Sequence, residues 1–177
     1  VCDDTLKIVF SLIENSTTPL VLDADALNCV AKQPEILLRK KAPVIITPHP
    51  GEMSRLTGLA TPLVNAERER VALDFAQKYG VVTVLKGAGT VIASPNGKVL
   101  VNPTGNSGMA TGGSGDVLAG MTASILAQGA SAFSSAVAAV YLHGLAGDIA
   151  AEKYGIISML PTDLINCIPL AYKRGGF

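Results

Sequence analysis

The chain has 177 residues, of which 49% are hydrophobic and only 16% are charged, so it has ample apolar material for one globular core. Its 14 basic and 14 acidic residues cancel, which excludes the electrostatic footprint of a nucleic-acid-binding protein. The three cysteines are scattered without a CxxC spacing, so neither a zinc site nor a redox pair is expected, and a reduced, cytoplasmic compartment fits best. The longest apolar stretches are interrupted, so neither a membrane span nor a secretion signal is expected.

The first half of the chain alternates between helical and strand patterns. Three nearly unbroken apolar runs predict buried strands, at residues 19–22, 44–46 and 81–85. Helices are predicted before and between them, at residues 6–13 and 66–79. The second strand is followed by the turn Pro48–Gly51, and the third by Lys86–Gly89. Strands of Val, Ile and Leu separated by helices indicate a mainly parallel sheet covered on both faces, which is a three-layer α/β/α architecture.

The second half begins with a predicted hairpin and ends in helices. An Asn96-Gly97 turn is expected to join the short strands 90–93 and 98–101 as an antiparallel addition to the sheet. A segment rich in Gly, Ser, Thr and Asn follows, and two Ala-rich helices are predicted after it, at about residues 116–128 and 131–151. The last helix is predicted to begin at Pro161 and to be disturbed at Pro169.

A glycine-rich loop that ends in an aspartate is the strongest local signal for chemistry. Its glycines let backbone N–H groups converge on an anion, and the helix predicted to begin near Asp116 adds the positive end of its dipole. The anion hole is predicted at Gly113, Ser114 and Gly115. Asp116 is predicted to accept a hydroxyl proton during phosphoryl transfer. The segment could equally be a turn in which Asp116 caps the helix. It matches neither GxxxxGK[ST] nor GxGxxG.

A wider set of motifs resembles a known family. The stretch TGNSGMATGGSGDVLAG, residues 104–120, resembles the signature of bacterial NAD(P)H-hydrate dehydratases within the ribokinase-like superfamily. The resemblance continues in order through VLDADALN (21–28), TPHPGE (47–52), LKGAGTVIA (85–93), YLHGLAGD (141–148) and TDLI (162–165). Separate motifs in one order across nearly the whole chain are far more specific than a single glycine loop.

The resemblance implies roles for individual residues. In this family the KGAGT segment and the glycine before the aspartate contact the adenine nucleotide, which implies this role for Lys86, Gly87, Ala88, Gly89, Thr90 and Gly115. His49 and Asp116 match positions that contact the hydrated dinucleotide. Glu52 resembles the NxxE glutamate through which ribokinase-like kinases organise magnesium and phosphate through water. Without the resemblance, KGAGT is a plain turn and His49 a structural loop residue.

Four further polar residues are left outside the predicted site. Asp23 and Asp25 end a buried strand and could face the cleft, but each could equally cap the helix that begins near Ala26. His143 and Asp148 lie on an Ala-rich helix, where a hydrogen-bonded packing role is expected for both.

The implied activity is metabolite repair by a lyase. It would dehydrate the S epimer of hydrated NADH or NADPH back to NADH or NADPH, with ADP, in preference to ATP, as the cosubstrate and Mg²⁺ as the cofactor. A homo-oligomer, a tetramer in particular, is expected. Two alternatives stay open: a vitamin or sugar kinase of the same superfamily, and a non-catalytic nucleotide-binding module. Family members carry further strands before VLDADALN, so residues 1–177 are expected to form a single ribokinase-like domain that lacks its N-terminal strands and part of its substrate pocket.

Overall fold

A five-stranded sheet forms the centre of the computed structural model. The structure describes residues 2–176, so the first and last residues of the predicted domain, Val1 and Phe177, lie outside the described residues. The strands lie in chain order: β1 (Leu20–Leu22), β2 (Val44–Ile46), β3 (Val82–Leu85), β4 (Val91–Ala93) and β5 (Val99–Val101). β1, β2 and β3 are parallel, whereas β4 and β5 are added antiparallel. The predicted hairpin is confirmed, and the sheet as a whole is mixed. Within the described residues β1 pairs only with β2, so β1 forms one edge of the sheet.

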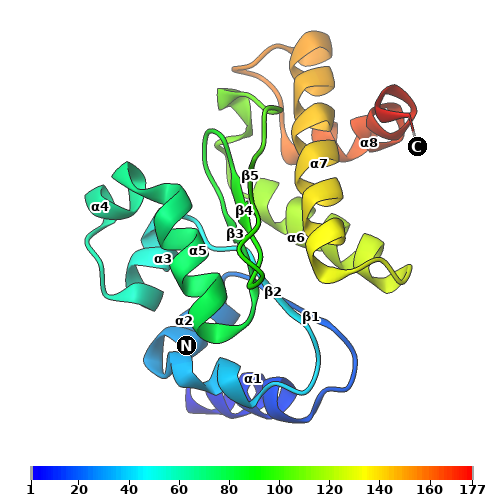
Figure 1. The fold of residues 1–177 in the computed structure, drawn as a ribbon. Coiled ribbons are helices and arrows are strands. Elements are labelled where there is room, and N and C mark those ends of the chain that lie inside the picture. Colours follow the sequence, from blue (N-terminus) through cyan, green and yellow to red (C-terminus); the bar gives the residue numbers. More distant parts are fainter. Residues whose placement is uncertain (1, 177) are drawn as a thin grey trace.

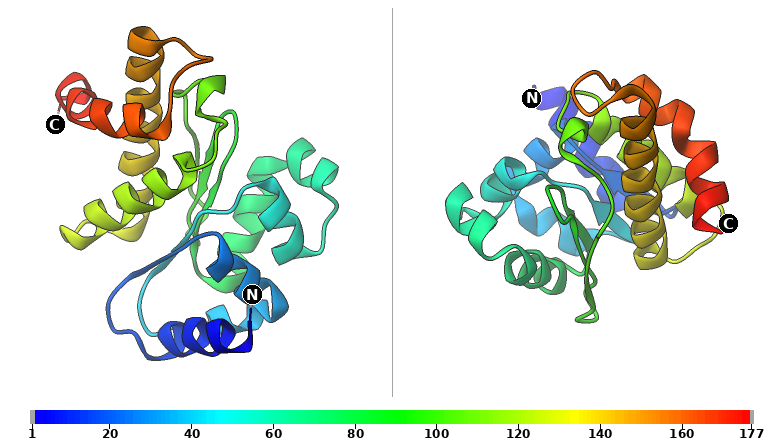
Figure 2. Two further views of the ribbon diagram at one scale, coloured as in Figure 1. Left: turned by 180° about the vertical axis from the view of Figure 1, so that it is seen from behind. Right: turned by 90° about the horizontal axis from the view of Figure 1, so that it is seen from above.

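Helices cover both faces of this sheet (Figures 1 and 2). The helices on the β1 side and on the first face are α1 (Asp3–Asn15), α2 (Asp25–Lys32), the 3-10 helix η1 (Pro34–Arg39), α3 (Pro50–Thr57), α4 (Thr61–Ala66) and α5 (Arg68–Tyr79). The second face carries α6 (Ser114–Ala127), α7 (Ala132–Tyr154) and α8 (Pro161–Gly175), and the 3-10 helix η2 (Ser107–Met109) lies in the segment that leads from β5 to α6. The view from above shows the sheet between the two helical layers, as the predicted three-layer architecture requires (Figure 2).

Two apolar cores hold the layers together, because successive residues of a strand point to opposite faces of a sheet. In β2, Val44 and Ile46 pack into the first core with α3 and α5, whereas Ile45 packs into the second core with α6, α7 and α8. All three side chains are at most 1% exposed. This burial on both faces explains why the strand is an unbroken apolar run in the sequence.

Several predicted boundaries need correction. The Pro48–Gly51 turn leads directly into α3, and α4 has no counterpart in the sequence prediction. α6 begins at Ser114, two residues before the predicted start, because Gly113 at φ 100° takes the N-cap position. Pro169 does not end α8, which runs on to Gly175. A proline removes one helical N–H, and the contacts beyond it compensate, since Ala171 is buried in the second core and Arg174 pairs with Glu152 of α7.

The helix α7 is long and apolar enough to cross a membrane by length and composition alone. Its most apolar window is, however, 56% buried inside the protein, and the central helix of a globular protein passes the same test. α7 packs against α6, α8 and the second face of the sheet. Its apolar character is accounted for by the second core.

Candidate active site

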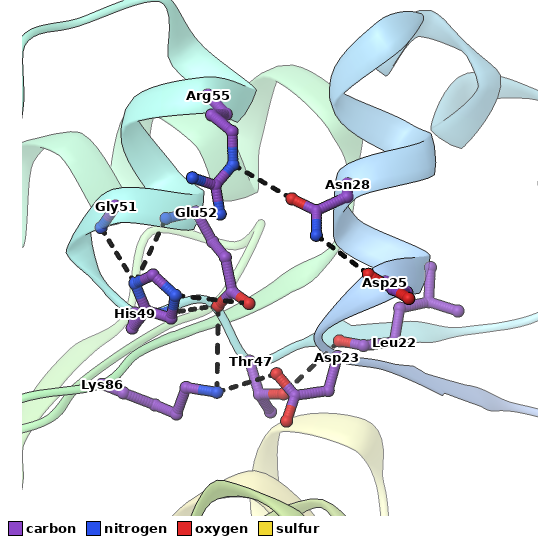
Figure 3. Close-up of polar contacts among 10 residues, drawn as sticks. All are labelled: Leu22, Asp23, Asp25, Asn28, Thr47, His49, Gly51, Glu52, Arg55 and Lys86. Carbon is purple, nitrogen blue, oxygen red and sulfur yellow. Dashed lines mark hydrogen bonds and ion pairs between the residues drawn. The ribbon is translucent and has the colours of Figure 1, made fainter. Parts of the chain in front are cut away.

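The carboxyl ends of the three parallel strands meet the N-terminus of α6. Asp23 follows β1, the Thr47–Glu52 segment follows β2, and Lys86 follows β3 (Figure 3). A Cβ added to Gly115 would lie 3.3 Å from Lys86 Nζ and 3.8 Å from an Asp23 carboxylate oxygen. The ends of three strands and the first turn of α6 therefore form one site, at the edge where open α/β sheets bind ligands.

Lys86 connects the carboxylates at this edge. Its ammonium group donates to Asp23 Oδ1 at 2.8 Å and lies 3.9 Å from Glu52 Oε2 (Figure 3). All three side chains are largely buried, with exposures of 19% for Lys86, 13% for Asp23 and 6% for Glu52. The sequence prediction left Asp23 outside the site, and the structure brings it in. Sixty-three residues separate Asp23 from Lys86, so no local spacing could reveal the pair.

The structure also separates the two aspartates of the VLDADALN segment. Asp25 lies in the first turn of α2 and accepts a hydrogen bond from the Asn28 side chain at 3.2 Å. Ala24 is the N-cap and, among the described residues, the only non-glycine with a positive φ, at 48°. Such a conformation is costly for alanine. The turn at Ala24 sends Asp23 towards Lys86 and Asp25 towards its own helix (Figure 3).

His49 is the N-cap of α3. Its Nδ1 accepts hydrogen bonds from the backbone N–H groups of Gly51 (3.0 Å) and Glu52 (3.3 Å), while Glu52 Oε2 accepts one from the His49 N–H at 2.8 Å. This reciprocal pair is a capping box with histidine in the usual serine position. Because Nδ1 accepts, any proton on the neutral ring lies on Nε2, which is 3.5 Å from Glu52 Oε1. The His49 side chain is 50% exposed at the carboxyl end of β2, where a ligand can reach it.

The Glu52 carboxylate accepts a hydrogen bond from the His49 N–H and lies near the Lys86 ammonium group. These contacts matter for the prediction that Glu52 helps to hold magnesium. Within residues 2–176, no three His, Cys, Asp or Glu side chains gather into a group that could hold a metal ion. The residues therefore do not fit a magnesium ion bound directly by several protein side chains. They fit an ion that is held mainly by phosphate oxygens and water, with Glu52 as an outer partner.

The start of α6 carries the predicted anion hole. The Ser114 N–H donates to the Thr111 carbonyl at 3.3 Å, so this member of the predicted hole already has a partner. Within the described chain, the N–H groups of Gly113, Gly115 and Asp116 have no backbone acceptor. These orphan donors at the start of α6 are available to an anion.

Asp116 occupies the third residue of α6, so the alternative in which it caps the helix is wrong. Its carboxylate is exposed and, among residues 2–176, makes no hydrogen bond or ion pair. A free carboxylate beside free N–H donors can accept a proton from a ligand that these donors hold.

The Lys86–Thr90 segment forms the connection between β3 and β4. Gly87 and Gly89 have φ angles of 149° and 62°, and the Thr90 hydroxyl donates to the Gly87 carbonyl at 3.0 Å. Gly87 and Ala88 are exposed, so the backbone at the tip of the turn is open to a ligand. The segment is thus a turn between strands, and its predicted nucleotide contact remains a prediction.

Two residues of α7 hold the segments around the anion hole. His143 Nε2 lies 3.0 Å from the Ser114 carbonyl oxygen. Burial lowers the pKa of His143 to about 4, so the ring is neutral and its Nε2–H donates to this carbonyl. The Asp148 carboxylate accepts from the Gly105 N–H at 2.9 Å and from the Asn106 side chain at 3.0 Å. The hydrogen-bonded role expected for both residues is confirmed.

Comparison with known proteins now identifies the family. A family model described as NAD(P)H-hydrate dehydratase matches residues 2–170. The chain belongs to this NAD(P)H-hydrate dehydratase family. The ADP-dependent (S)-NAD(P)H-hydrate dehydratase of Neisseria meningitidis is 44% identical over 151 residues, which are 84% of this chain and 51% of that protein. The chain spans about a third to a half of the length of such curated relatives.

Solved structures agree with the family. The ADP/ATP-dependent NAD(P)H-hydrate dehydratase of Bacillus subtilis, co-crystallized with ATP and Mg²⁺, is 36% identical with a TM-score of 0.83, over 92% of this chain and 57% of that one. A ribokinase-like superfamily protein from Enterococcus faecalis is 30% identical with a TM-score of 0.83, over 98% of this chain and 60% of that one. The predicted ribokinase-like fold is thereby confirmed for this member of the dehydratase family.

Proposed function

We propose that this chain carries the catalytic half of an ADP-dependent NAD(P)H-hydrate dehydratase, which returns the S epimer of hydrated NADH or NADPH to NADH or NADPH. The observation that carries the proposal is the unpartnered Asp116 carboxylate beside the orphan N–H donors of α6. Membership of the dehydratase family supports the substrate class. The names of the Neisseria and Bacillus relatives support ADP, with ATP as a second cosubstrate.

Phosphorylation solves the chemical difficulty that hydroxide is a poor leaving group. Asp116 accepts the proton of the ring hydroxyl while the hydroxyl oxygen bonds to the terminal phosphorus of ADP, and AMP leaves as the phosphorus–oxygen bond of the nucleotide breaks. Phosphate is then eliminated together with a proton from the neighbouring ring carbon, which restores the double bond. The balance is hydrated NADH plus ADP giving NADH, AMP and phosphate. The N–H groups of Gly115 and Asp116 stabilise the transferred group.

Other residues hold the two substrates in this proposal. The Lys86–Thr90 turn and Gly115 bind the adenine nucleotide, and His49 contacts the hydrated dinucleotide from the end of β2. Lys86 places a positive charge beside Gly115, where phosphate would lie. Magnesium, held by phosphate oxygens and through water by Glu52, would neutralise phosphate charge.

The wider setting is also part of the proposal. Residues 1–177 would form part of one ribokinase-like domain of a cytoplasmic protein that assembles as a homo-oligomer, a tetramer in particular.

The deciding experiment supplies enzymatically hydrated NADH, ADP and Mg²⁺ and follows the recovery of the dihydronicotinamide absorbance. Recovery with release of AMP and phosphate is the expected result, and the R epimer should persist. A stable phosphorylated product without recovered absorbance would indicate the kinase alternative. The same assay is run on the full-length protein that includes this chain. If that protein gives no recovery with either ADP or ATP, the dehydratase assignment is wrong.

Replacement of Asp116 by asparagine tests the base. Asp116→Asn keeps the size of the side chain but cannot accept the proton, so turnover should fall by at least about 100-fold while ADP binding changes little. Asp4→Asn is the control, since Asp4 is an exposed aspartate in the first turn of α1 and should not affect turnover. Steady-state kinetics and calorimetric titration with ADP provide the two readouts. Wild-type turnover in Asp116→Asn would exclude the base role.

A further inference from the structure

Arg68, the first residue of α5, reaches the end of β3. Its Nη2 donates to the carbonyl oxygen of Leu85 at 2.8 Å, directly before the Lys86–Thr90 turn. The guanidinium therefore anchors the backbone from which the proposed nucleotide-binding turn departs.

The guanidinium also lies against the turn itself. A Cβ added to Gly87 would meet Arg68 Nη1 at 2.8 Å and Nη2 at 3.0 Å. Gly87 has φ 149°, and a side chain there would be strained as well as blocked. Glycine at position 87 thus allows the backbone of the turn to rest directly on a positive charge.

No carboxylate compensates this charge. Within residues 2–176, no Asp or Glu oxygen lies within 4 Å of the Arg68 guanidinium, and Arg68 Nε is buried without a hydrogen-bond partner. Arg70, on the same helix, is exposed and pairs with Glu67 and Asp74. Burial lowers the pKa of Arg68, but an arginine side chain stays protonated at any pH that a folded protein experiences. Arg68 is partly buried, and a partly buried cation without an anion carries a desolvation cost that an anionic ligand nearby would offset.

We infer that Arg68 is a positioning residue that holds the Lys86–Thr90 turn in place and supplies, from behind it, the positive charge that nucleotide phosphates compensate. The inference rests on the proposed binding of ADP at this turn. It assigns part of the affinity for phosphate to a residue that need not touch the nucleotide. It also explains why the guanidinium is left unpaired while its neighbour on α5 is not.

The test measures the binding of adenosine, AMP and ADP by calorimetry in the wild type and in three variants. Arg68→Met removes the charge and keeps an unbranched side chain, whereas Arg68→Lys keeps the charge and loses the planar fork. Arg70→Met is the matched control on the same helix. We expect Arg68→Met to weaken ADP binding about tenfold or more and adenosine binding by no more than about twofold, with AMP between them. Arg68→Lys should retain most of the phosphate-dependent affinity, and Arg70→Met should bind all three ligands as the wild type does.

The outcomes separate the inference from the function on which it rests. Suppose that the wild type binds ADP. If Arg68→Met then binds ADP as tightly as the wild type, or if the substitution weakens adenosine and ADP binding equally, the inference is wrong and the proposed nucleotide site is retained. A wild type that binds no ADP contradicts the proposed function itself. Circular dichroism checks the fold of each variant. Should Arg68→Met be unfolded, Arg68→Gln, which is neutral and can still donate, replaces it in the comparison with Arg68→Lys.

Discussion

At the scale of single residues, the neutral state of His143 has a consequence for stability. Burial, and to a smaller extent the positive charge of Lys86, lower the pKa of His143 from the ordinary 6.5 to about 4, although its bond to the Ser114 carbonyl acts in the opposite direction. Between pH 6.5 and pH 4 the unfolded chain therefore binds a proton that the folded chain does not. The stabilising contribution of neutral His143 is complete above about pH 6.5 and is lost as the pH falls towards 4.

His143→Gln should reduce this pH dependence. The glutamine amide can donate to the Ser114 carbonyl but does not titrate, so the variant should lose less unfolding free energy than the wild type between pH 7.5 and 4.5. The difference should be roughly 3 kcal/mol at most, from the size of the pKa change. Urea unfolding at both pH values measures it. Parallel pH profiles in the two proteins would show that His143 does not titrate as inferred.

The sequence could reveal the residues that stand in local patterns and could not reveal those that meet only in the fold. Asp116 follows three glycines, and His49 stands three residues before Glu52, so both were visible as motifs. Asp23 was ambiguous because its partner Lys86 comes from another strand. Arg68 gave no signal, since an arginine at the start of a helix is ordinary until its side chain is placed.

At the scale of elements, α7 is the scaffold for the loop that precedes the anion hole. The Thr104 hydroxyl donates to the Tyr141 carbonyl at 2.9 Å, and the Thr104 backbone approaches α7 where Gly144 presents no side chain. A Cβ at Gly144 would lie 2.2 Å from Thr104 Oγ1 and 2.8 Å from its carbonyl carbon. The glycine is therefore required by packing, which the predicted Ala-rich helix did not reveal.

Two glycine-to-alanine variants in helices should consequently change stability in opposite directions. Gly144→Ala forces the Thr104 backbone to shift and should destabilise the protein by about 1–3 kcal/mol. Gly120→Ala on α6 meets no atom within 4 Å and should stabilise it by about 0.5–1 kcal/mol, because alanine restricts the unfolded chain more than glycine does. Urea denaturation of both variants decides. Destabilisation by both substitutions, or by neither, would contradict the packing argument.

The long elements were easier to predict than the short ones. α7 is 23 residues long and was predicted from its Ala-rich composition, and α5 has 12 residues, whereas α3 and α4 are only 8 and 6 residues long. The histidine capping box that starts α3 lies outside the usual Ser, Thr, Asp and Asn preferences. Pro169 was expected to disturb α8, and only the tertiary contacts of residues 171–174 explain why the helix continues.

At the scale of the whole molecule, the candidate site joins the two cores. Asp23, Glu52 and Lys86 follow strands that anchor in both cores, whereas Asp116 belongs to α6, which packs only into the second. The parallel direction of the first strands and the helical layers on both faces of the sheet followed from the alternation of strands and helices, because parallel strands need helical crossovers. The sequence could not predict which polar residues at the ends of the strands would come together, because this depends on the twist and register of the sheet.

Because the site draws on both cores, ADP should bind only to the folded molecule and should raise its melting temperature. At a free ADP concentration of 100 times the dissociation constant, the stabilisation is about 2.7 kcal/mol, which corresponds to a rise of roughly 5–10 °C for a chain of this size. Differential scanning calorimetry with and without ADP measures it. Asp116→Asn should show nearly the same rise, because the proposed base acts in proton transfer rather than in nucleotide binding, and Arg68→Met should show a smaller one. An unchanged melting temperature for the wild type over a wide range of ADP concentrations would contradict nucleotide binding at the junction of α6 with the parallel strands.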